Sequence, residues 1–257
     1  MRGTAVENNK RPSTSGSASP PAITGLRKSY VKWRASYLGK IADALETELI
    51  LELLGPVAGL KLLDVGCGDG VFALELTRRG ANVTGLDADA DMVRAARKRA
   101  EAESTQPHFV EGKAERLPVD DAAFDGVVAV TVLCFVRDAE RAVAEMARVL
   151  KPGGRLVIGE LGRWSLWAMQ RRIRGWLGAR TWRAARFRTA AELGRLVSST
   201  GLRPSEMRGG VFYPPLAIAA RLLAPVDLRL GRSTTFGAAF IALSASRPPG
   251  VTKPGRQ

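Results

Sequence analysis

The stretch LLDVGCGDG, residues 62–70, sets the architecture of the chain. Its apolar first half, together with Leu60, predicts a buried strand. The glycines that follow allow a tight turn and a close backbone approach to a ligand at the N-terminus of the next helix. That helix is predicted over 71–79, and the next strand over 81–87 ends on Asp87. About thirty residues, the size of one βαβ unit, thus contain in order a strand, a glycine turn, a helix, a second strand and an acidic residue.

The same alternation continues on both sides of this unit. Asp89, Asp138 and the sequence TAAE at 189–192 are typical of helix N-termini, and Lys151–Gly154 predicts a turn. The remaining predicted helices are 30–54, 89–103, 138–150 and 190–200, and the remaining predicted strands are 108–111, 124–131, 155–160, 203–212 and 236–246. Alternating helices and strongly apolar strands predict an α/β fold, a doubly wound and mostly parallel sheet covered on both faces.

A single domain is expected over residues 26–248. Residues 1–25 are rich in Ser, Pro and Gly without an apolar period, which predicts a disordered tail, and 249–257 are expected to form a second flexible tail. Three segments fall outside the regular alternation. They are a predicted N-terminal helical lid at 28–55 and helical insertions at 163–188, after the fifth strand, and 213–233, between the sixth and seventh strands.

Composition excludes several classes of protein. Two cysteines, Cys67 and Cys134, cannot form a disulfide framework, which predicts a reduced, cytoplasmic protein. The longest apolar run, 127–136, is too short to cross a bilayer, and no secretory signal is expected in the first thirty residues. The only histidine is His108, so no metal site and no Ser-His-Asp hydrolase are predicted.

Charge is unevenly distributed around a formal net value of +14. An acidic middle is flanked by basic segments, and residues 163–188 carry eight arginines, four tryptophans and no acid. Within this insertion Leu166, Met169 and Ile173 recur at helical spacing, with Arg171 among the residues between them. Such a helix suits weak peripheral contact with the inner face of a membrane or a lid over an apolar substrate. The alternative is a lid packed on the domain, with its arginines solvated.

We expect the glycine turn to bind an adenosine compound, because the Asp87 carboxylate can accept hydrogen bonds from both ribose hydroxyls. Asp64 lies two residues before the first glycine, where it would repel the pyrophosphate of a dinucleotide but attract an ammonium group. An NAD(P)-linked oxidoreductase remains an alternative, since Gly68, Gly70 and Ala73 fit a loose dinucleotide pattern. A non-catalytic binder of adenosine ligands is a third interpretation.

Four blocks resemble the class I S-adenosylmethionine-dependent methyltransferases, most closely the type 11 group that includes ubiquinone- and menaquinone-biosynthesis enzymes. The blocks are LLDVGCGDG (62–70), GLDADADM (85–92), EGKAERLPVDDAAFDGVVAV (111–130) and AEMARVLKPGGRLVIGEL (144–161). The resemblance implies a Rossmann-like sheet of seven strands, with an antiparallel last strand, and S-adenosyl-L-methionine as the cofactor. The cofactor-binding residues that it implies are Asp64, Gly66, Cys67, Gly68, Gly70, Asp87, Ala88, Lys113, Ala114, Glu115, Thr131 and Leu133.

The methyl acceptor is expected to be a small or lipid-like molecule. Methyl transfer from a sulfonium is a displacement that needs alignment and exclusion of water, and a base only where the acceptor must lose a proton. Glu160, at the end of the fifth strand, is the candidate base, with a structural role as the alternative. Thr131–Cys134 lacks the residues of DNA-methylating enzymes, so no nucleic-acid partner is predicted, and no obligate protein partner is evident.

Overall fold

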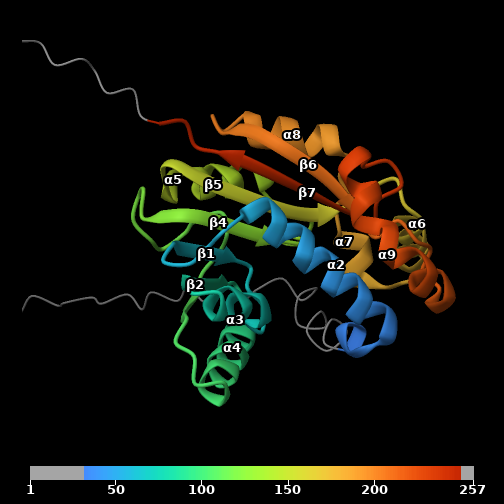
Figure 1. Cartoon of the computed structure of the whole chain (residues 1–257), viewed down its shortest axis with the longest axis horizontal. Helices are drawn as coiled ribbons and strands as arrows, with labels where there is room; N and C mark the ends of the chain where they lie inside the picture. Colours follow the sequence, from blue (N-terminus) through green and yellow to red (C-terminus); the bar gives the residue numbers. More distant parts are fainter. Residues whose placement is uncertain (1–31, 250–257) are drawn as a thin grey trace, which may run out of the picture.

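A computed structural model describes residues 32–249 of the chain and shows one seven-stranded sheet with the order β3-β2-β1-β4-β5-β7-β6 (Figure 1). The strands are β1 (Lys61–Val65), β2 (Asn82–Asp87), β3 (His108–Glu111), β4 (Phe124–Val130), β5 (Leu150–Leu161), β6 (Arg203–Gly210) and β7 (Phe240–Ser246). Strands β1 to β5 pair in parallel, and β7 runs antiparallel between β5 and β6. The predicted fold class is confirmed.

Helices cover both faces of the sheet. One apolar core forms under α2 (Tyr37–Leu54), α3 (Val71–Arg78) and α4 (Ala90–Ala102) and includes residues of α9 (Ala217–Ser233). The other core forms under α5 (Ala139–Val149) and α8 (Ala190–Ser198). Because the central strands are buried on both sides, they carry consecutive apolar residues, as the sequence indicated.

The predicted helix starts are confirmed by their capping hydrogen bonds. The Asp89 carboxylate accepts from the Asp91 N–H, and the Asp138 carboxylate accepts from the Arg141 N–H. Thr189 and Glu192 exchange both hydrogen bonds of a capping box at α8. These local signals locate the helix starts correctly because each cap satisfies backbone donors within one turn.

Four predicted boundaries are wrong. The helix predicted at 30–54 is interrupted at Ser36, whose hydroxyl accepts from Gly39 N–H and starts α2 at Tyr37. The predicted turn at 151–154 belongs to β5, since Gly153 and Gly154 exchange backbone hydrogen bonds with Arg247. The last strands are shorter than predicted: β6 ends at Gly210, and β7 begins only at Phe240, after Gly237 with a φ of 83°. The predicted tail at 1–25 lies outside the described residues, as does most of the one at 249–257.

The insertion at 163–188 folds into two helices at one end of the molecule (Figure 1). They are α6 (Leu166–Trp176) and α7 (Arg180–Ala184), and they pack against each other. Trp167 is buried and donates from its indole Nε1 to the Tyr213 carbonyl at 2.8 Å. This bond ties the first insertion to the segment that precedes α9.

Candidate active site

The glycine turn is a tight loop with three left-handed residues. Gly66, Gly68 and Gly70 have φ values of 74°, 55° and 81°. A Cβ on Gly66 would lie 2.3 Å from Val132 Cγ2, and one on Gly70 would lie 2.8 Å from Ala96 Cβ, so neither position accommodates a side chain. Gly68 differs, because a Cβ there would meet no atom within 4 Å. Its open side faces the cavity described below, where a ligand can approach the backbone.

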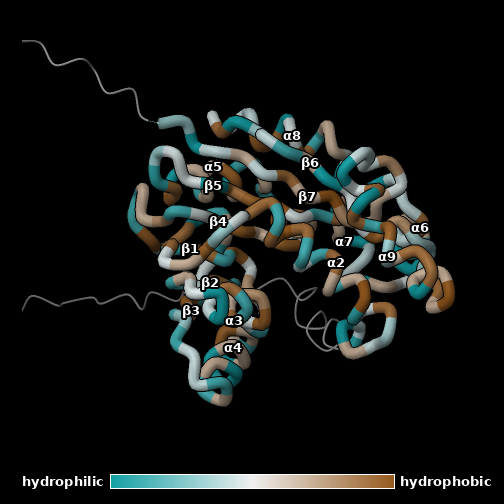
Figure 2. Tube along the Cα trace, in the orientation of Figure 1, coloured by the Kyte–Doolittle hydropathy of each residue, from teal (hydrophilic) through white to brown (hydrophobic). Residues whose placement is uncertain are grey.

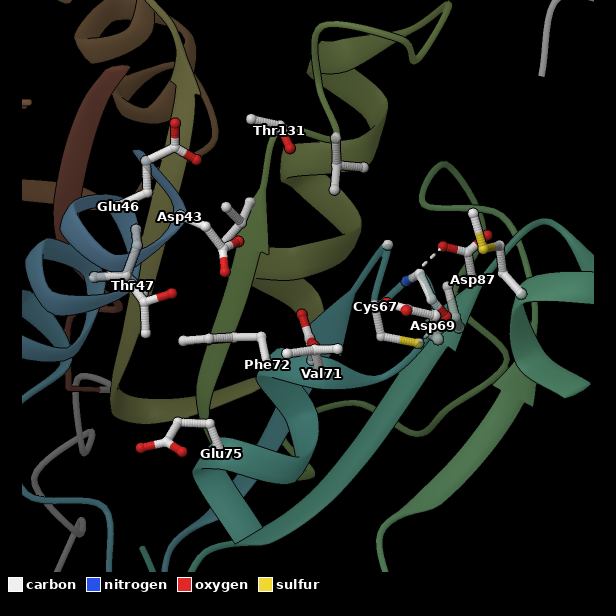
Figure 3. A pocket seen from close by; sticks show the side chains of 18 of the residues that line it. Asp43, Glu46, Thr47, Cys67, Asp69, Val71, Phe72, Glu75, Asp87 and Thr131 are labelled. Atoms are coloured by element: carbon white, nitrogen blue, oxygen red, sulfur yellow. Dashed lines mark hydrogen bonds between the residues drawn. The ribbon is translucent and has the colours of Figure 1, made fainter. Parts of the chain in front are cut away.

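Asp87 joins the glycine loop to the loop after β2. Its Oδ2 accepts from Gly68 N–H at 2.9 Å (Figure 3). Its Oδ1 accepts from Asp89 N–H at 2.9 Å. Burial raises the pKa of this carboxyl, and the backbone donors oppose that shift. The carboxylate is therefore fixed at the carboxyl end of β2.

Asp64 presents an unsatisfied oxygen to the same cavity. It is 2% exposed, and its Oδ2 finds no hydrogen-bond partner among residues 32–249. Burial, reinforced by the nearby Asp87 charge, raises the pKa of Asp64 to about 7. A buried acceptor without a donor is unfavourable, and a cationic N–H donor on a ligand would relieve it.

A cavity of about 1290 Å³ runs from this loop to α2. Its lining includes ten of the twelve residues predicted for cofactor binding, which are Asp64, Gly66, Cys67, Gly68, Asp87, Ala88, Lys113, Ala114, Glu115 and Thr131. The other two lie outside the lining. Gly70 packs against α4, and Leu133 is fully buried behind the loop that follows β4.

Glu160 also lies outside the cavity lining. It is 1% exposed, and its Oε1 accepts from Leu133 N–H at 2.8 Å. Its Oε2 lies 3.7 Å from the Arg188 guanidinium. This geometry favours the structural alternative, in which Glu160 fixes the loop that carries Thr131. Cys134 is likewise buried, and burial holds the pKa of its thiol well above the usual range, consistent with an inert thiol.

Neither insertion lines this cavity, although a lid over the substrate was one interpretation of residues 163–188. No residue of 163–188 or 213–233 belongs to its lining, and the wall opposite the glycine loop comes from α2. The apolar stripe of α6 faces solvent, with Trp176 80% exposed and Leu177 82% exposed, whereas Arg171 is buried. Helical periodicity identified the stripe correctly, but the domain packs on the opposite face of the helix.

Several lining residues were not singled out from the sequence. Glu46, Thr47 and Ile50 come from α2, and Phe72 and Phe135 add aromatic surface. Only their position on predicted elements could have suggested them, because no motif marks them. Figure 3 shows Glu46 and Asp43 on the α2 side and Cys67, Asp69 and Asp87 on the side of the glycine loop.

Three carboxyls with raised pKa values make stability pH-dependent. Burial raises the pKa of Asp64 and of Glu160 to about 7 each and that of Glu46 to about 8, so between about pH 4 and pH 8 the folded chain binds more protons than the unfolded chain. We expect the free energy of unfolding to fall between pH 5 and pH 8, by up to about 1.4 kcal/mol per carboxyl for each pH unit below its folded pKa. Urea titrations at the two pH values measure it. Glu160→Gln should reduce the fall, and stability that rises over this interval would contradict the assignment.

The comparisons with known proteins agree with this geometry. Residues 63–158 match the family model described as methyltransferase domain. The chain is 32% identical over 180 residues to a ubiquinone biosynthesis O-methyltransferase of Rhodopseudomonas palustris, covering 68% of this chain and 70% of that one. It is 38% identical over 131 residues to methyltransferase GfsG of Streptomyces halstedii. That match spans 49% of this chain and only 47% of GfsG, less than half of the relative's length.

A solved structure shows the same fold. The SAM-dependent methyltransferase from Thermotoga maritima superposes with a TM-score of 0.68 over 88% of this chain and 98% of that one, at 24% identity. Strand order, the antiparallel β7 and the glycine loop together define a class I methyltransferase fold with an adenosine-ligand site. The chain belongs to the class I S-adenosylmethionine-dependent methyltransferases.

Proposed function

We propose that this chain transfers the methyl group of S-adenosylmethionine to a hydroxyl oxygen of a small, flat or lipid-like acceptor. The proposal rests on the Oδ2 of Asp64, which has no hydrogen-bond partner within residues 32–249 and lies beside a glycine loop that is open at Gly68. Such a site needs a ligand that brings a cationic donor, as an amino acid moiety does. Oxygen is favoured as the acceptor atom because relatives at 30–34% identity are named ubiquinone biosynthesis O-methyltransferases.

The residues around the cavity suit S-adenosylmethionine. Asp64 would hold its ammonium group, the Gly66–Gly68 backbone would lie along the methionine moiety, and Asp87 would hold the ribose. The residues around Lys113–Glu115 would frame the adenine. When bound, this compound supplies an electrophilic methyl group on a sulfonium. The chain aligns the acceptor and keeps water away, for which the apolar lining by Ile50, Phe72 and Phe135 is appropriate.

Calorimetry and turnover test the proposal. We expect S-adenosylhomocysteine to bind, and NAD and NADP not to bind. Turnover is then measured with a panel of catechols, polyketide phenols and prenylated phenols, followed by mass spectrometry for a gain of one methyl group. Binding of NAD without S-adenosylhomocysteine would overturn the proposal in favour of an oxidoreductase, and binding without turnover on any hydroxyl acceptor would favour a non-catalytic binder.

The second part of the proposal is that the protein makes peripheral contact with a membrane. A lipid-like acceptor partitions into the bilayer, so an enzyme that uses it has to reach the membrane surface. Over residues 32–249 no helix has the length and apolar character needed to span a membrane. Instead, α6 and α9 expose apolar residues at one end of the molecule (Figure 2). The exposed set comprises Trp164, Leu166, Met169, Ile173, Trp176, Leu177, Leu216, Ile218, Leu222, Leu223, Val226 and Leu230. Arginines 172, 174, 221 and 229 on the same helices suit anionic headgroups.

Co-sedimentation with vesicles tests this contact. We expect the chain to bind vesicles that contain phosphatidylglycerol more than pure phosphatidylcholine, and binding to weaken with salt, since arginine attraction is screened. The triple variant Ile173→Ser, Trp176→Ser, Leu177→Ser should lose most of the binding. Tyr37→Ser is the matched control, since Tyr37 is an exposed aromatic residue of α2 outside this surface. Equal retention by the triple variant would refute the role of α6.

A further inference from the structure

Glu46 is an acid on the α2 wall of the cavity. The buried face of α2, with Leu45, Leu49 and Leu53, packs on the sheet, and this fixes the helix rotation. Glu46 and Thr47 then line the cavity opposite the glycine loop. The end of β4 contributes Thr131 to the same lining (Figure 3). A carboxyl group therefore reaches the space that the acceptor must share with the methyl donor.

Within residues 32–249, two other acids of α2 have bonded partners and Glu46 has none; Glu48 also has none, but its side chain is exposed. Asp43 forms a salt bridge with Arg34 at 2.8 Å, and Glu52 bonds Arg232 at 3.2 Å. Glu46 forms no hydrogen bond or salt bridge with any of residues 32–249. Its two oxygens are thus available to a bound molecule.

The groups that face Glu46 set its protonation. Burial raises its pKa to about 8, and the Asp43 charge adds to this effect. Arg171 of α6 opposes the shift most strongly, with a smaller contribution from Arg34. The Tyr213 hydroxyl, buried without a hydrogen-bond partner among the described residues, is the remaining titratable neighbour. A base that titrates near pH 8 is suited to accept a proton under physiological conditions.

Arg171 is held firmly where it influences Glu46. Its guanidinium carbon lies 5.3 Å from the centroid of the Trp167 ring and 5.0 Å from that of Trp182. Such stacking stabilises a buried cation. The insertion therefore acts on the cavity through this charge although it contributes no lining residue.

We propose that Glu46 is the proton acceptor for the hydroxyl group of the methyl acceptor, an inference that rests on the proposed O-methyl transfer. The acceptor oxygen gives its proton to the Glu46 carboxylate and forms a bond to the methyl carbon. The bond between that carbon and sulfur breaks, and sulfur keeps the electron pair. Glu160, the base candidate predicted from the sequence, cannot serve here because it lies outside the cavity lining.

The kinetic test compares Glu46→Gln with the wild type on an acceptor that the panel identifies. We expect kcat of the wild type to rise with pH to a midpoint near 8, and kcat of Glu46→Gln to be at least tenfold lower at pH 8.5 and flat with pH. KM for the acceptor should change less than threefold. Glu101→Gln on the exposed face of α4 is the matched control. Unchanged kcat with an unchanged pH profile in Glu46→Gln would overturn the inference.

A binding measurement gives a readout without turnover. Calorimetry of catechol with the S-adenosylhomocysteine complex, in two buffers of different ionisation enthalpy, reports proton exchange near pH 8. On binding catechol, the wild-type complex should exchange a fraction of a proton with the buffer, and the Glu46→Gln complex should exchange none. The same number of protons exchanged by both proteins would count against the inference. If Glu46→Gln does not fold, Arg171→Met is used instead. Because the Arg171 charge lowers the pKa of Glu46, its loss should move the midpoint of the kcat–pH profile to higher pH. A midpoint that does not move would contradict the inference. If no hydroxyl acceptor is methylated by the wild type, the proposed function itself fails.

Discussion

Replacing Asp87 by alanine should lower the affinity for S-adenosylhomocysteine about 100-fold. The carboxylate is expected to hold the ribose hydroxyls, and hydrogen bonds to a charged acceptor contribute about 1.5–3 kcal/mol each. The same oxygens also accept from Gly68 N–H and Asp89 N–H, so the variant loosens the glycine loop as well. A loss of about 2–3 kcal/mol therefore follows, and a factor of 100 corresponds to about 2.7 kcal/mol.

Calorimetry with purified Asp87→Ala measures this loss directly. Asp120→Ala is the control, because Asp120 is an exposed acid in the segment before β4 and lies outside the cavity lining. Circular dichroism and a thermal scan establish that both variants fold. A folded Asp87→Ala protein with the affinity of the wild type would show that Asp87 does not bind the ribose.

The glycine loop was predictable from the sequence because its requirements are local. Few backbone conformations are possible for a turn that connects a strand to a helix through closely spaced glycines. The structure shows three positive φ values in this turn. The caps at Asp89, Asp138 and Thr189 were predictable for the same reason. Each depends on a side chain and a backbone group within three residues.

The acceptor side of the cavity was not predictable in this way. Glu46 acquires its role from the rotation of α2, and that rotation is fixed by packing on strands more than 50 residues away in the sequence. The insertion illustrates the same limit. Periodicity separated an apolar and a basic side of α6, but Trp167 and Trp182 enclose Arg171, so the basic side faces inward there. Which face of an amphipathic helix is buried depends on partners that no local pattern reveals.

Glu160 shows how a position at a strand end leaves two roles open, that of a base and that of a structural hydrogen-bond acceptor. The sequence placed it at the carboxyl end of β5, where ligands of open α/β sheets bind. The structure turns its carboxyl group toward the Leu133 backbone and Arg188 instead. An acid at a strand end is therefore a candidate whose role depends on which way the side chain points, and that direction is set by the neighbouring loop.

Replacing Gly68 by valine should abolish measurable binding of S-adenosylhomocysteine. A matched replacement at Gly59 shows whether the loss comes from backbone strain or from obstruction of the ligand. Gly68 and Gly59 both have positive φ, 55° and 77°, and a Cβ at either position meets no protein atom within 4 Å. A β-branched residue is strained at such a φ, by about 1–3 kcal/mol, so both variants should lose similar stability. Only Gly68 faces the cavity, where the added side chain would occupy the space of the ligand.

Urea denaturation and calorimetry on Gly68→Val and Gly59→Val separate strain from obstruction. We expect comparable losses in the free energy of unfolding for the two variants, with wild-type affinity retained by Gly59→Val alone. If both variants lost affinity equally, backbone strain would explain the effect. If Gly68→Val folded and bound S-adenosylhomocysteine as the wild type does, the ligand would not pass along the glycine loop, and Asp64 would need another cationic partner to satisfy its buried oxygen.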